Sequence, residues 1–497
     1  MIPRDHARLS LHAVKEFGRS AGVSHAIRAD RRQMFLLPPN LDDWLPKEHP
    51  VRFLADLVDS LDLSELGFRQ PSSGEDGRPH YAAELLLSVW LYGWMERVRS
   101  SRALEKACLR DLAFVWLTGN QHPDHNTLWR FFRDNRNAFR ILFKKTVQVA
   151  VKANLVGFAL HALDGTKVQA ASSTDTALHR RAMQEQLKQL DQVIDASIQR
   201  IDAAETQPEP AYTMPDALRD AKQRREQIRQ SLRELDAADT DHMHTAEQEA
   251  RTMKIRGHSS ALGYNAQVIV DHDSDLIVCT DVTVEQADSV QLVPMLQQML
   301  DEQGRVADQT IADAGYTSGA QLDEAERRHL PVIVGFQMQA GEDGPYAKAT
   351  FQYDCERNVY ICPRDETLPF IRTESPSEKG KPIAIHIYRC GNTTCPVRGE
   401  CTTSKRGREI KRMEYEGAVE RQRERQEPYA MQVLLKLRKE IVEHIFGILK
   451  GIDGFRRFTV RGLEAVRGQW ALACSALNLR KLYAAWSSGG QRVLSAG

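Results

Sequence analysis

Two short apolar segments, far apart in the sequence and each ending in aspartate, constrain the fold of this chain most strongly. The first is FALHALD at residues 158–164, and the second is DQTIAD at residues 308–313. Apolar runs of this length predict buried strands, and a glycine shortly after each aspartate permits a tight turn or close approach by a ligand. We therefore expect both strands to end at one edge of a shared sheet, with Asp164 and Asp313 at that edge.

The segments around these strands complete an α/β pattern. Residues 263–270 (GYNAQVIV) and 276–284 (LIVCTDVTV) alternate with a period of two on either side of a polar turn, which predicts a β-hairpin. We expect helices over residues 286–301 and 321–328, and a strand in LPVIVGF at residues 330–336. The predicted fold class is therefore α/β, with an antiparallel edge on the sheet.

The rest of the chain is mainly helical in pattern. We expect a core helix in residues 82–95, an amphipathic helix over 100–119, and a further helical run over 122–153 with Asp124 and Asn126 as candidate caps. Apolar residues spaced by three and four over 183–201 and 218–235 predict a helical hairpin, packed on itself or on a second copy. Residues 418–450 predict a helix interrupted near Pro428, and residues 464–483 a final helix.

Charge limits how the chain can bind nucleic acid. The 67 Lys and Arg residues balance the 67 Asp and Glu residues, which excludes binding by bulk positive charge. Residues 97–152, however, hold 12 basic residues against 4 acidic ones. Arg130 and Arg133 in HPDHNTLWRFFR are the candidate DNA contacts of this segment. An ordinary solvated helical face explains the same excess equally well.

Carboxylates in this chain are candidate metal ligands. Asp164 and Asp313 suit a hard divalent cation such as Mg²⁺, although aspartate also commonly begins turns. A third carboxylate, Glu443, lies in LKLRKEIVEHIFGILKG, almost opposite the apolar stripe on a helical wheel. Three lysines lie within about 40° of it on that wheel and are candidate phosphate contacts: Lys436, Lys439 and Lys450. A solvated charged face is the alternative, and Glu440 is the rival carboxylate.

Five of the eight cysteines lie within residues 355–401. Four of them form a candidate tetrahedral zinc site, with Cys355 as a possible replacement for one: Cys362, Cys390, Cys395 and Cys401. Their spacing is looser than the usual paired motif, so unmetallated thiols are the alternative. We expect this segment to be rich in loops, with little core of its own and a structural role for zinc.

The chain shows no membrane or secretion signal. No apolar run reaches the roughly 18 residues that a membrane helix needs, and the N-terminus lacks an apolar signal core. These features predict a cytoplasmic protein that does not contact a membrane. Clustered cysteines in that compartment favour metal binding over disulfides.

Several motifs together resemble a known family. In chain order they are GRPHYAAELLLSVWLYGW, HPDHNTLWRFFR, LDGTKV, GYNAQVIVDHDSDLIVCTDVT, IADAGYTSG, the cysteine-rich ICP…YRC…CPVRGECT and VEHIFGILKG. In this order they resemble the DDE transposases of bacterial insertion sequences, in the branch with a helical N-terminal domain and a cysteine-rich insertion. The resemblance runs from about Met34 to Leu482. Lys436 and Lys439 stand where the family's tail signature has Tyr and Arg, whereas Glu443 and Lys450 match it.

The resemblance implies a ribonuclease-H-like core in which Asp164, Asp313 and Glu443 hold two Mg²⁺ or Mn²⁺ ions. It implies binding of terminal inverted repeats, DNA cleavage and strand transfer to target DNA, most simply by a homodimer in a synaptic complex. In a bacterium the protein would work in the cytoplasm, on the nucleoid. A catalytically inactive DNA-binding repressor and a general metal-dependent nuclease are the alternatives.

The same reading predicts the domain boundaries. Residues 1–33 are a flexible extension and residues 34–155 a helical DNA-binding domain. The catalytic core comprises residues 156–178, 251–339 and 406–484. It is interrupted by a helical hairpin at 179–250 and by the cysteine-rich insertion at 340–405. Residues 485–497 form a flexible tail.

Overall fold

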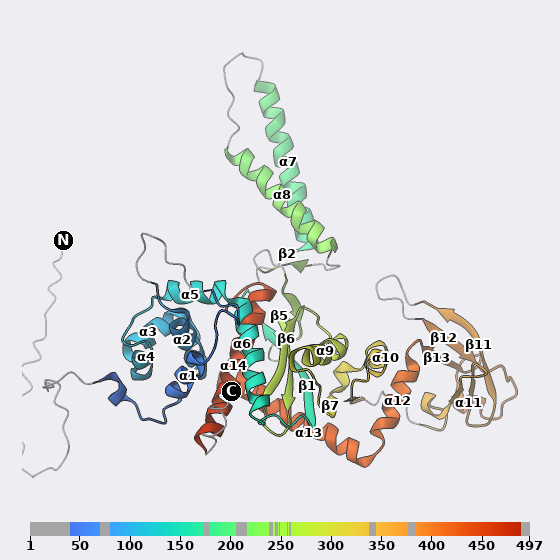
Figure 1. Cartoon of the computed structure of the whole chain (residues 1–497). Coiled ribbons are helices and arrows are strands. Elements are labelled where there is room, and N and C mark those ends of the chain that lie inside the picture. The colour runs from blue at the N-terminus through green and yellow to red at the C-terminus, as the bar shows by residue number, and fades with distance from the viewer. Residues whose placement is uncertain are drawn as a thin grey trace, which may run out of the picture. The chain divides into compact units, whose positions relative to one another are not determined.

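The computed structural model describes residues 40–69, 80–172, 178–204, 216–237, 242–243, 247, 249–255, 257, 260–336, 344–375 and 384–488 (Figure 1). The predicted extension at 1–33 lies outside the described residues, as do residues 489–497 of the predicted tail. Residues 1–45 and 46–497 form two separate units. In the first unit, the described part is a short 3-10 turn, η1 (Leu41–Trp44), capped by the side chain of Asn40. The predicted domain boundaries remain predictions.

Six helices open the second unit: α1 (Pro50–Asp59), α2 (Ala83–Met95), α3 (Ser101–Arg110), α4 (Leu112–Leu117), α5 (His125–Asp134) and α6 (Arg136–Lys152). The single helix predicted over residues 100–119 is wrong. The chain breaks at Asp111, whose carboxylate accepts the backbone N–H groups of Ala113 and Phe114 and so starts a new helix. Asp124 caps α5 as predicted, whereas Asn126 lies inside that helix.

The predicted sheet forms in the middle of the chain. Its strands are β1 (Leu160–Gln169), β4 (Arg251–Met253), β5 (Ala261–Asp271), β6 (Ile277–Thr283), β7 (Gln309–Ala312) and β8 (Val332–Val334). The order is β4-β5-β1-β7-β8, and β6 pairs with β5 in the predicted hairpin. β1, β7 and β8 are parallel, whereas β5 is antiparallel to its neighbours. Every residue of β5 is buried, as expected for a central strand.

Helices that come between and after the strands in the sequence cover this sheet. They are α9 (Leu292–Gln303), α10 (Gly319–Arg327), α12 (Glu416–Gln426), α13 (Tyr429–Phe446) and α14 (Leu463–Ser487), with short turns η3 (Asp288–Val290), η4 (Ala314–Tyr316) and the π-helix η6 (Gly447–Ile452). α13 packs against β1 and β7, and α14 packs against β6, α2 and α6. Pro428 separates α12 from α13 as predicted, whereas α14 continues three residues into the predicted flexible tail.

The predicted helical hairpin consists of α7 (Arg180–Ala204) and α8 (Asp216–Ala237), which lie side by side (Figure 1). The short strands β2 (Leu178–His179) and β3 (His242–Met243) pair at its base. Met183 and Ile228 are buried between the helices, and Leu187, Leu190 and Leu232 pack around them. The two apolar faces therefore cover each other. The proline-rich connection lies outside the described residues.

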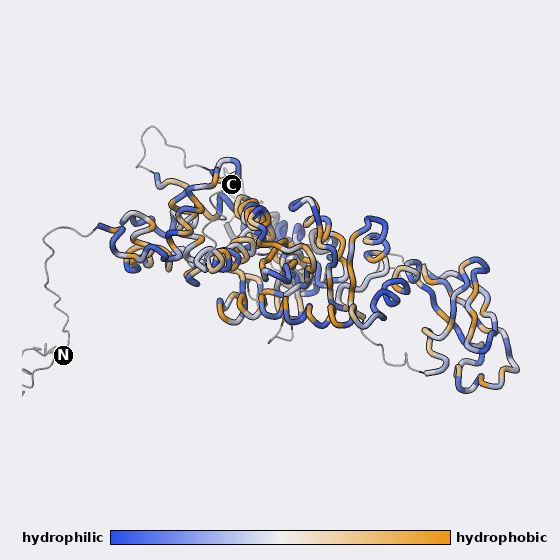
Figure 2. Tube along the Cα trace, turned by 60° about the horizontal axis from the view of Figure 1, so that its bottom comes forward, coloured by the Kyte–Doolittle hydropathy of each residue, from blue (hydrophilic) through white to orange (hydrophobic). Residues whose placement is uncertain are grey.

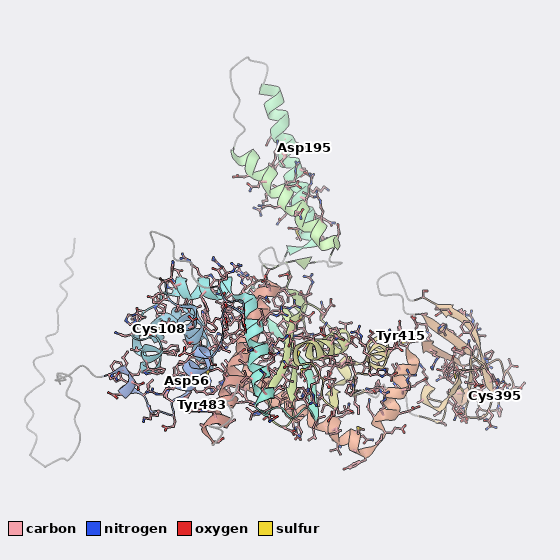
Figure 3. All side chains as sticks on the ribbon, viewed as in Figure 1. Asp56, Cys108, Asp195, Cys395, Tyr415 and Tyr483 are labelled. Carbon is pink, nitrogen blue, oxygen red and sulfur yellow. The ribbon has the colours of Figure 1, made fainter. Side chains whose placement is uncertain are left out.

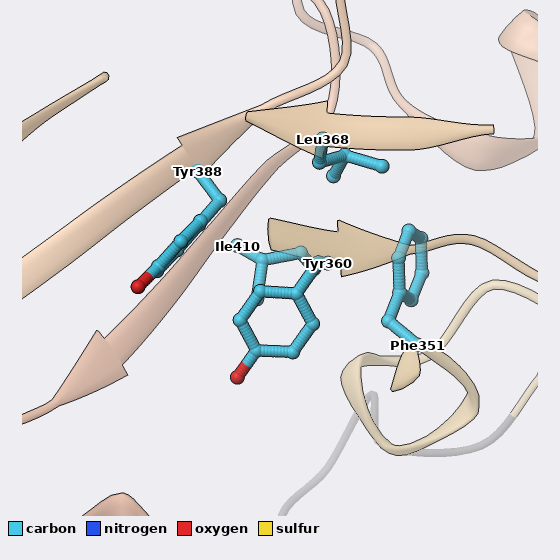
Figure 4. Close-up of a cluster of buried hydrophobic side chains, with 5 residues drawn as sticks. All are labelled: Phe351, Tyr360, Leu368, Tyr388 and Ile410. Atoms are coloured by element: carbon cyan, nitrogen blue, oxygen red, sulfur yellow. The ribbon is translucent and has the colours of Figure 1, made fainter. Parts of the chain in front are cut away.

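The prediction that residues 340–405 have little core of their own is wrong, although loops still connect the short strands of this segment. An antiparallel sheet forms there in the order β13-β12-β11-β10-β9, from β9 (Gln352–Asp354), β10 (Val359–Ile361), β11 (Thr367–Glu374), β12 (Ile385–Arg389) and β13 (Glu409–Met413). The turns η5 (Lys348–Thr350) and α11 (Arg398–Cys401) flank it. Its core contains Phe351, Tyr360, Leu368, Tyr388 and Ile410 (Figure 4). Two of these strands have only three residues, so their alternation is too brief to stand out in the sequence.

Hydrophobic stretches gather in the interior of the helical and sheet regions, and hydrophilic stretches lie at the periphery (Figure 2). α2 is buried almost throughout, in agreement with the prediction of a core helix. No helix in the described ranges is both long enough and apolar enough to cross a membrane.

Candidate active site

Neighbouring parallel strands bring Asp164 and Asp313 together. β1 pairs with β7 in the register Leu163–Ala312, so the two aspartates occupy the next pair of positions. Asp313 directly follows β7, as predicted. The prediction that Asp164 ends its strand is wrong, because β1 continues to Gln169 along β5. Asp164 instead follows the last residue of β1 that pairs with β7. Both aspartates therefore lie at the end of the β1–β7 pairing.

The carboxylate of Asp164 is mostly buried and ion-paired. Its side chain is 17% exposed, and Oδ2 accepts a hydrogen bond from Nη1 of Arg438 at 2.7 Å. Oδ1 accepts the backbone N–H of Gly165 at 2.7 Å. Burial is the main cause that raises the pKa of Asp164 to about 6. Arg438 acts in the opposite direction, and the negative charge of Asp313 adds to the rise.

Asp313 is held by the turn that follows it. Its Oδ1 accepts the backbone N–H of Gly315 at 2.9 Å and caps η4. This bond fixes the direction of one carboxylate oxygen and leaves the other without a hydrogen bond to the described residues. Asp313 is therefore a rigidly oriented, partly exposed ligand candidate beside Asp164.

A buried polar network lies behind the two aspartates. The carboxylate of Asp288 accepts bonds from Lys167 at 2.9 and 3.1 Å, from Asn265 at 2.7 Å and from Gln267 at 2.8 Å. The hydroxyl of Tyr316 donates to Oε1 of Gln267, and Tyr316 has no exposed surface. The network joins β1, β5, η3 and η4, which are the elements next to both aspartates.

Gly165 allows this network to approach β1. A Cβ atom at Gly165 would clash with Nε2 of Gln267 and lie 2.6 Å from Oδ1 of Asp288. The glycine that follows Asp164 in the sequence therefore serves packing by neighbouring side chains. The sequence predicted a tight turn or an approaching ligand at this position, and this role was not foreseen.

Glu443 does not join the two aspartates. It lies on α13, its side chain is 64% exposed, and it forms an ion pair with Lys439 at 3.9 Å. The face of α13 that meets the sheet carries buried Ile441, Val442 and Ile445. Arg438 lies on that same face, whereas Glu443 is about 140° away around the helix. Among the described residues, no three acidic, histidine or cysteine side chains are gathered closely enough to hold a metal ion.

The donor chemistry of Asp164 and Asp313 fits a hard divalent cation, because two carboxylates meet at one edge in a mostly buried setting. The guanidinium of Arg438 already supplies positive charge at Asp164. Two of the three carboxylates predicted as ligands therefore lie at the same edge of the sheet. Arg438 would compete with a cation for the carboxylate of Asp164, and the two aspartates would need further ligands from protein, water or DNA to complete the coordination of a cation.

The predicted basic contacts differ in their surroundings. Nζ of Lys450 donates to the backbone carbonyl of Lys167 at 2.7 Å, which ties the end of α13 and η6 to β1. Lys436 and Lys439 are exposed on α13. Arg130 is exposed on α5, while Arg133 is ion-paired with Asp134 at 2.7 Å. Lys436, Lys439 and Arg130 therefore belong to solvated charged faces, which was the alternative to DNA contact.

Four of the predicted zinc ligands share one region of the five-stranded sheet, where Figure 3 labels Cys395. Sγ of Cys362 accepts backbone N–H bonds from Arg364 and Glu366, both at 3.4 Å. Burial raises the pKa of the Cys401 thiol and Arg408 lowers it, while the other three thiols are close enough to raise it further. Cys355 is exposed and takes no part in these contacts. The four thiols are neighbours but are not gathered in metal geometry.

The sequence did not indicate Arg438, Asp288 or Tyr316 as site residues. One signal was available for Arg438, because it is a single arginine close to the apolar stripe of its helix. No local signal marks Asp288, and Tyr316 lies in the quoted motif IADAGYTSG without being singled out there. Their roles depend on strand pairing between distant segments.

Two family models match the chain. Residues 39–134 match a Transposase domain (DUF772), and residues 361–483 match a Transposase DDE domain. The first covers most of the helical region, and the second includes the four clustered cysteines and Glu443. Asp164 and Asp313 lie between the two matches. Neither the curated proteins nor the solved structures contain a significant match.

The matched helical domain and the matched C-terminal domain both support a transposase. More specifically, the two matches support a DDE transposase of the insertion-sequence type, the family that the motifs resemble.

Proposed function

We propose that this transposase binds the terminal inverted repeats of its element, cleaves DNA strands there and transfers the ends to target DNA. The observation that carries the proposal is the placement of Asp164 beside Asp313 at one edge of the parallel strands. The path β6-β5-β1-β7-β8, with antiparallel pairing in the hairpin and parallel pairing beyond it, supports a ribonuclease-H-like core. In a bacterial host we place its action in the cytoplasm, at the nucleoid.

Asp164 and Asp313 are the proposed ligands for two Mg²⁺ or Mn²⁺ ions, with Glu443 as the third carboxylate. Such a pair of ions supplies an activated water and stabilises the leaving oxygen of a phosphodiester. The turn that fixes Asp313 and the network behind Asp164 orient the two carboxylates before DNA binds. Arg438 leaves Asp164 as the site assembles, and rotation or a local shift of α13 brings Glu443 toward the aspartates.

Strand cleavage of an end-of-element duplex with Mg²⁺ tests this assignment. We expect Asp164→Asn, Asp313→Asn and Glu443→Gln each to lower the cleavage rate at least about a hundredfold, since one electrostatic contact to the transition state is worth this much. Glu440→Gln is the matched control, because Glu440 is an exposed carboxylate on the same helix. Loss of cleavage in Glu440→Gln but not in Glu443→Gln would reassign the third carboxylate.

A DNA-binding repressor without catalysis is the second candidate. The ion pair between Arg438 and Asp164, together with the exposed Glu443, favours it. Repeat-specific binding without cleavage in Mg²⁺ and Mn²⁺ would establish this role. Cleavage of unrelated duplexes at the same rate as end duplexes would instead identify a general nuclease.

A structural zinc ion is the proposed partner of Cys362, Cys390, Cys395 and Cys401. The support is the proximity of the four thiols and the two backbone N–H groups directed at Cys362. We expect one zinc per chain in metal analysis of the purified full-length protein. Cys390→Ser should lose the zinc and Cys355→Ser should retain it. Full zinc content in Cys390→Ser would contradict this site.

A homodimer is the proposed assembly, because two transposon ends must be held together before joining. The apolar faces of α7 and α8 already pack on each other, so the interface need not involve this hairpin. Light scattering of the full chain with end duplexes tests the assembly. A complex with one protein copy per two ends would contradict it.

A further inference from the structure

A basic hollow lies where α5 and α6 meet the segment between η6 and α14. It encloses about 540 Å³, and its lining includes Trp129, Arg136, Ala171, Arg457, Phe458 and Arg461. This volume falls in the range of small-ligand pockets and is too small for a duplex. The site is separate from the two aspartates.

The walls of the hollow are fixed by backbone contacts. The backbone N–H of Phe458 donates to the carbonyl of Gln169 at 2.9 Å, and Nε of Arg457 donates to the carbonyl of Ala170 at 3.0 Å. On the other side, α14 approaches α6 so closely that a Cβ at Gly468 would lie 2.7 Å from the backbone carbonyl oxygen of Arg136. The hollow is therefore a built feature that joins the end of β1 to the helical region.

Positive charge in the hollow is not neutralised. Within the described ranges, none of Arg136, Arg457 and Arg461 has an acidic partner within ion-pair distance. Other arginines do, such as Arg133 with Asp134 at 2.7 Å. Nε of Arg136 is also buried without a hydrogen-bond acceptor. The unpaired positive charge of these arginines favours an anionic ligand in the hollow.

Trp129 adds a stacking surface to this charge. The side chain of Trp129 is 38% exposed. One side of the indole stacks on Phe132, with ring centroids 6.0 Å apart and planes 26° apart. An exposed indole beside guanidinium groups is the combination that binds the base and the phosphates of single-stranded nucleic acid.

We propose that this hollow binds one unpaired nucleotide of the DNA on which the transposase acts, with the base against Trp129 and the flanking phosphates on Arg136, Arg457 and Arg461. This inference rests on the proposed function. Asp164 and Gln169 are five residues apart on β1, on the order of 16 Å. The hollow is therefore close enough to Asp164 for one DNA molecule to reach both sites.

Equilibrium binding of the full-length protein to fluorescein-labelled (dT)₂₀ and to a 20-base-pair duplex, both in EDTA, tests the hollow. We expect Trp129→Ala to weaken binding of (dT)₂₀ roughly 5- to 100-fold, as for loss of one stacked base, and to change duplex binding less than about twofold. Trp129→Phe retains a stacking ring and should stay within about threefold of wild type. Tyr429→Ala, at another exposed aromatic residue, is the matched control.

Charge reversal tests the phosphate contacts without altering the core. Arg457→Glu and Arg461→Glu change exposed residues, so folding is expected to be retained. Arg457→Glu also removes the bond to Ala170, so Arg461→Glu is the cleaner test of charge. Each should weaken (dT)₂₀ binding and lower its salt dependence by roughly one released counterion. Arg357→Glu, in the five-stranded sheet region, should do neither. These variants test the hollow even if Trp129→Ala fails to fold.

Three results would overturn the proposal. The first is unchanged (dT)₂₀ binding in Arg457→Glu, in Arg461→Glu and in a folded Trp129→Ala. The second is equal binding of a fully abasic 20-mer and (dT)₂₀, which would show that phosphates alone are bound. The third is displacement by free thymidine monophosphate at concentrations comparable to (dT)₂₀, which would indicate a mononucleotide site. Asp164→Asn should bind (dT)₂₀ normally, so failure of cleavage and failure of the hollow are distinguishable.

Discussion

Arg438 donates from Nη1 to Oδ2 of Asp164 at 2.7 Å, so the protein itself supplies the positive charge beside the first candidate catalytic carboxylate. Both side chains are mostly buried, at 16% and 17% exposed. Even with this partner, burial leaves the pKa of Asp164 raised to about 6. The ionised carboxylate is therefore held in an unfavourable setting, as expected for a group whose stabilising partner arrives later.

Asp164→Asn should stabilise the protein at pH 8 in the absence of divalent cations. The pKa of Asp164 is higher in the folded state than its ordinary value of 3.8, so the folded state binds this proton more tightly. Its ionisation therefore costs no stability below about pH 3.8, and the cost grows to its full value above about pH 6. Two pKa units correspond to at most about 3 kcal/mol.

Thermal unfolding at pH 8 and pH 4.5 in EDTA measures this effect. The midpoint of Asp164→Asn should exceed that of wild type at pH 8, and the gap should shrink at pH 4.5. Asp308→Asn, at an exposed aspartate, is the control and should show no such pH dependence. A lower midpoint for Asp164→Asn at both pH values would mean that the ion pair with Arg438 outweighs the burial of the charge.

Arg438→Gln should change cleavage in two measurable ways. Because Arg438 lowers the pKa of Asp164, its removal should move the acidic limb of the pH–rate profile, near pH 6 in wild type, to higher pH. At a pH well above the acidic limb of both proteins, removal of the competing guanidinium should lower the Mg²⁺ concentration needed for half-maximal cleavage. Arg438→Lys keeps a charge and should show smaller changes.

Both shifts are needed to support a competing role for Arg438. A variant that loses cleavage at every pH and Mg²⁺ concentration, with unchanged stability, would instead indicate that Arg438 contacts DNA in the reaction.

The sequence predicted the parts of this fold that depend on local patterns. The β5–β6 hairpin and the position of Asp313 after β7 follow from alternation and from a short apolar run that ends in aspartate. Asp164 was misplaced within its strand because residues 165–169 are not strongly apolar. Their extension depends on backbone pairing with β5, which is contributed by a distant segment.

Glu443 shows a second limit of sequence reasoning. A helical wheel separates the apolar stripe of α13 from Glu443, but it does not say which face meets the aspartates. In the structure the apolar face packs against the sheet and brings Arg438 to Asp164, while Glu443 stays exposed. The role of Glu443 therefore remains a prediction from the family resemblance.

Tyr316→Phe should weaken the network behind the aspartates. The change removes the bond to Gln267 and leaves a buried amide oxygen without its donor, at a cost of about 1–3 kcal/mol. We expect a lower thermal midpoint and a slower cleavage rate. The reason is that η4, which contains Tyr316, also supplies the backbone N–H of Gly315 that orients Asp313. Tyr429→Phe alters an exposed hydroxyl and should change neither. Unchanged stability in Tyr316→Phe would show that the network is not required for packing.

Gly468→Ala should destabilise the contact between α14 and α6. An added Cβ would lie 2.7 Å from the backbone oxygen of Arg136, and backbone atoms can yield only if the two helices separate. We expect a loss of about 1–3 kcal/mol, measured by denaturant unfolding. Gly447→Ala is the matched control, because Gly447 has helical φ and ψ and its Cβ would meet no atom within 4 Å. There the substitution should stabilise the chain by up to about 1 kcal/mol. Since Arg136 lines the hollow, Gly468→Ala should also weaken (dT)₂₀ binding. A Gly468→Ala variant with lower stability but unchanged (dT)₂₀ binding would show that the position of Arg136 does not affect binding in the hollow.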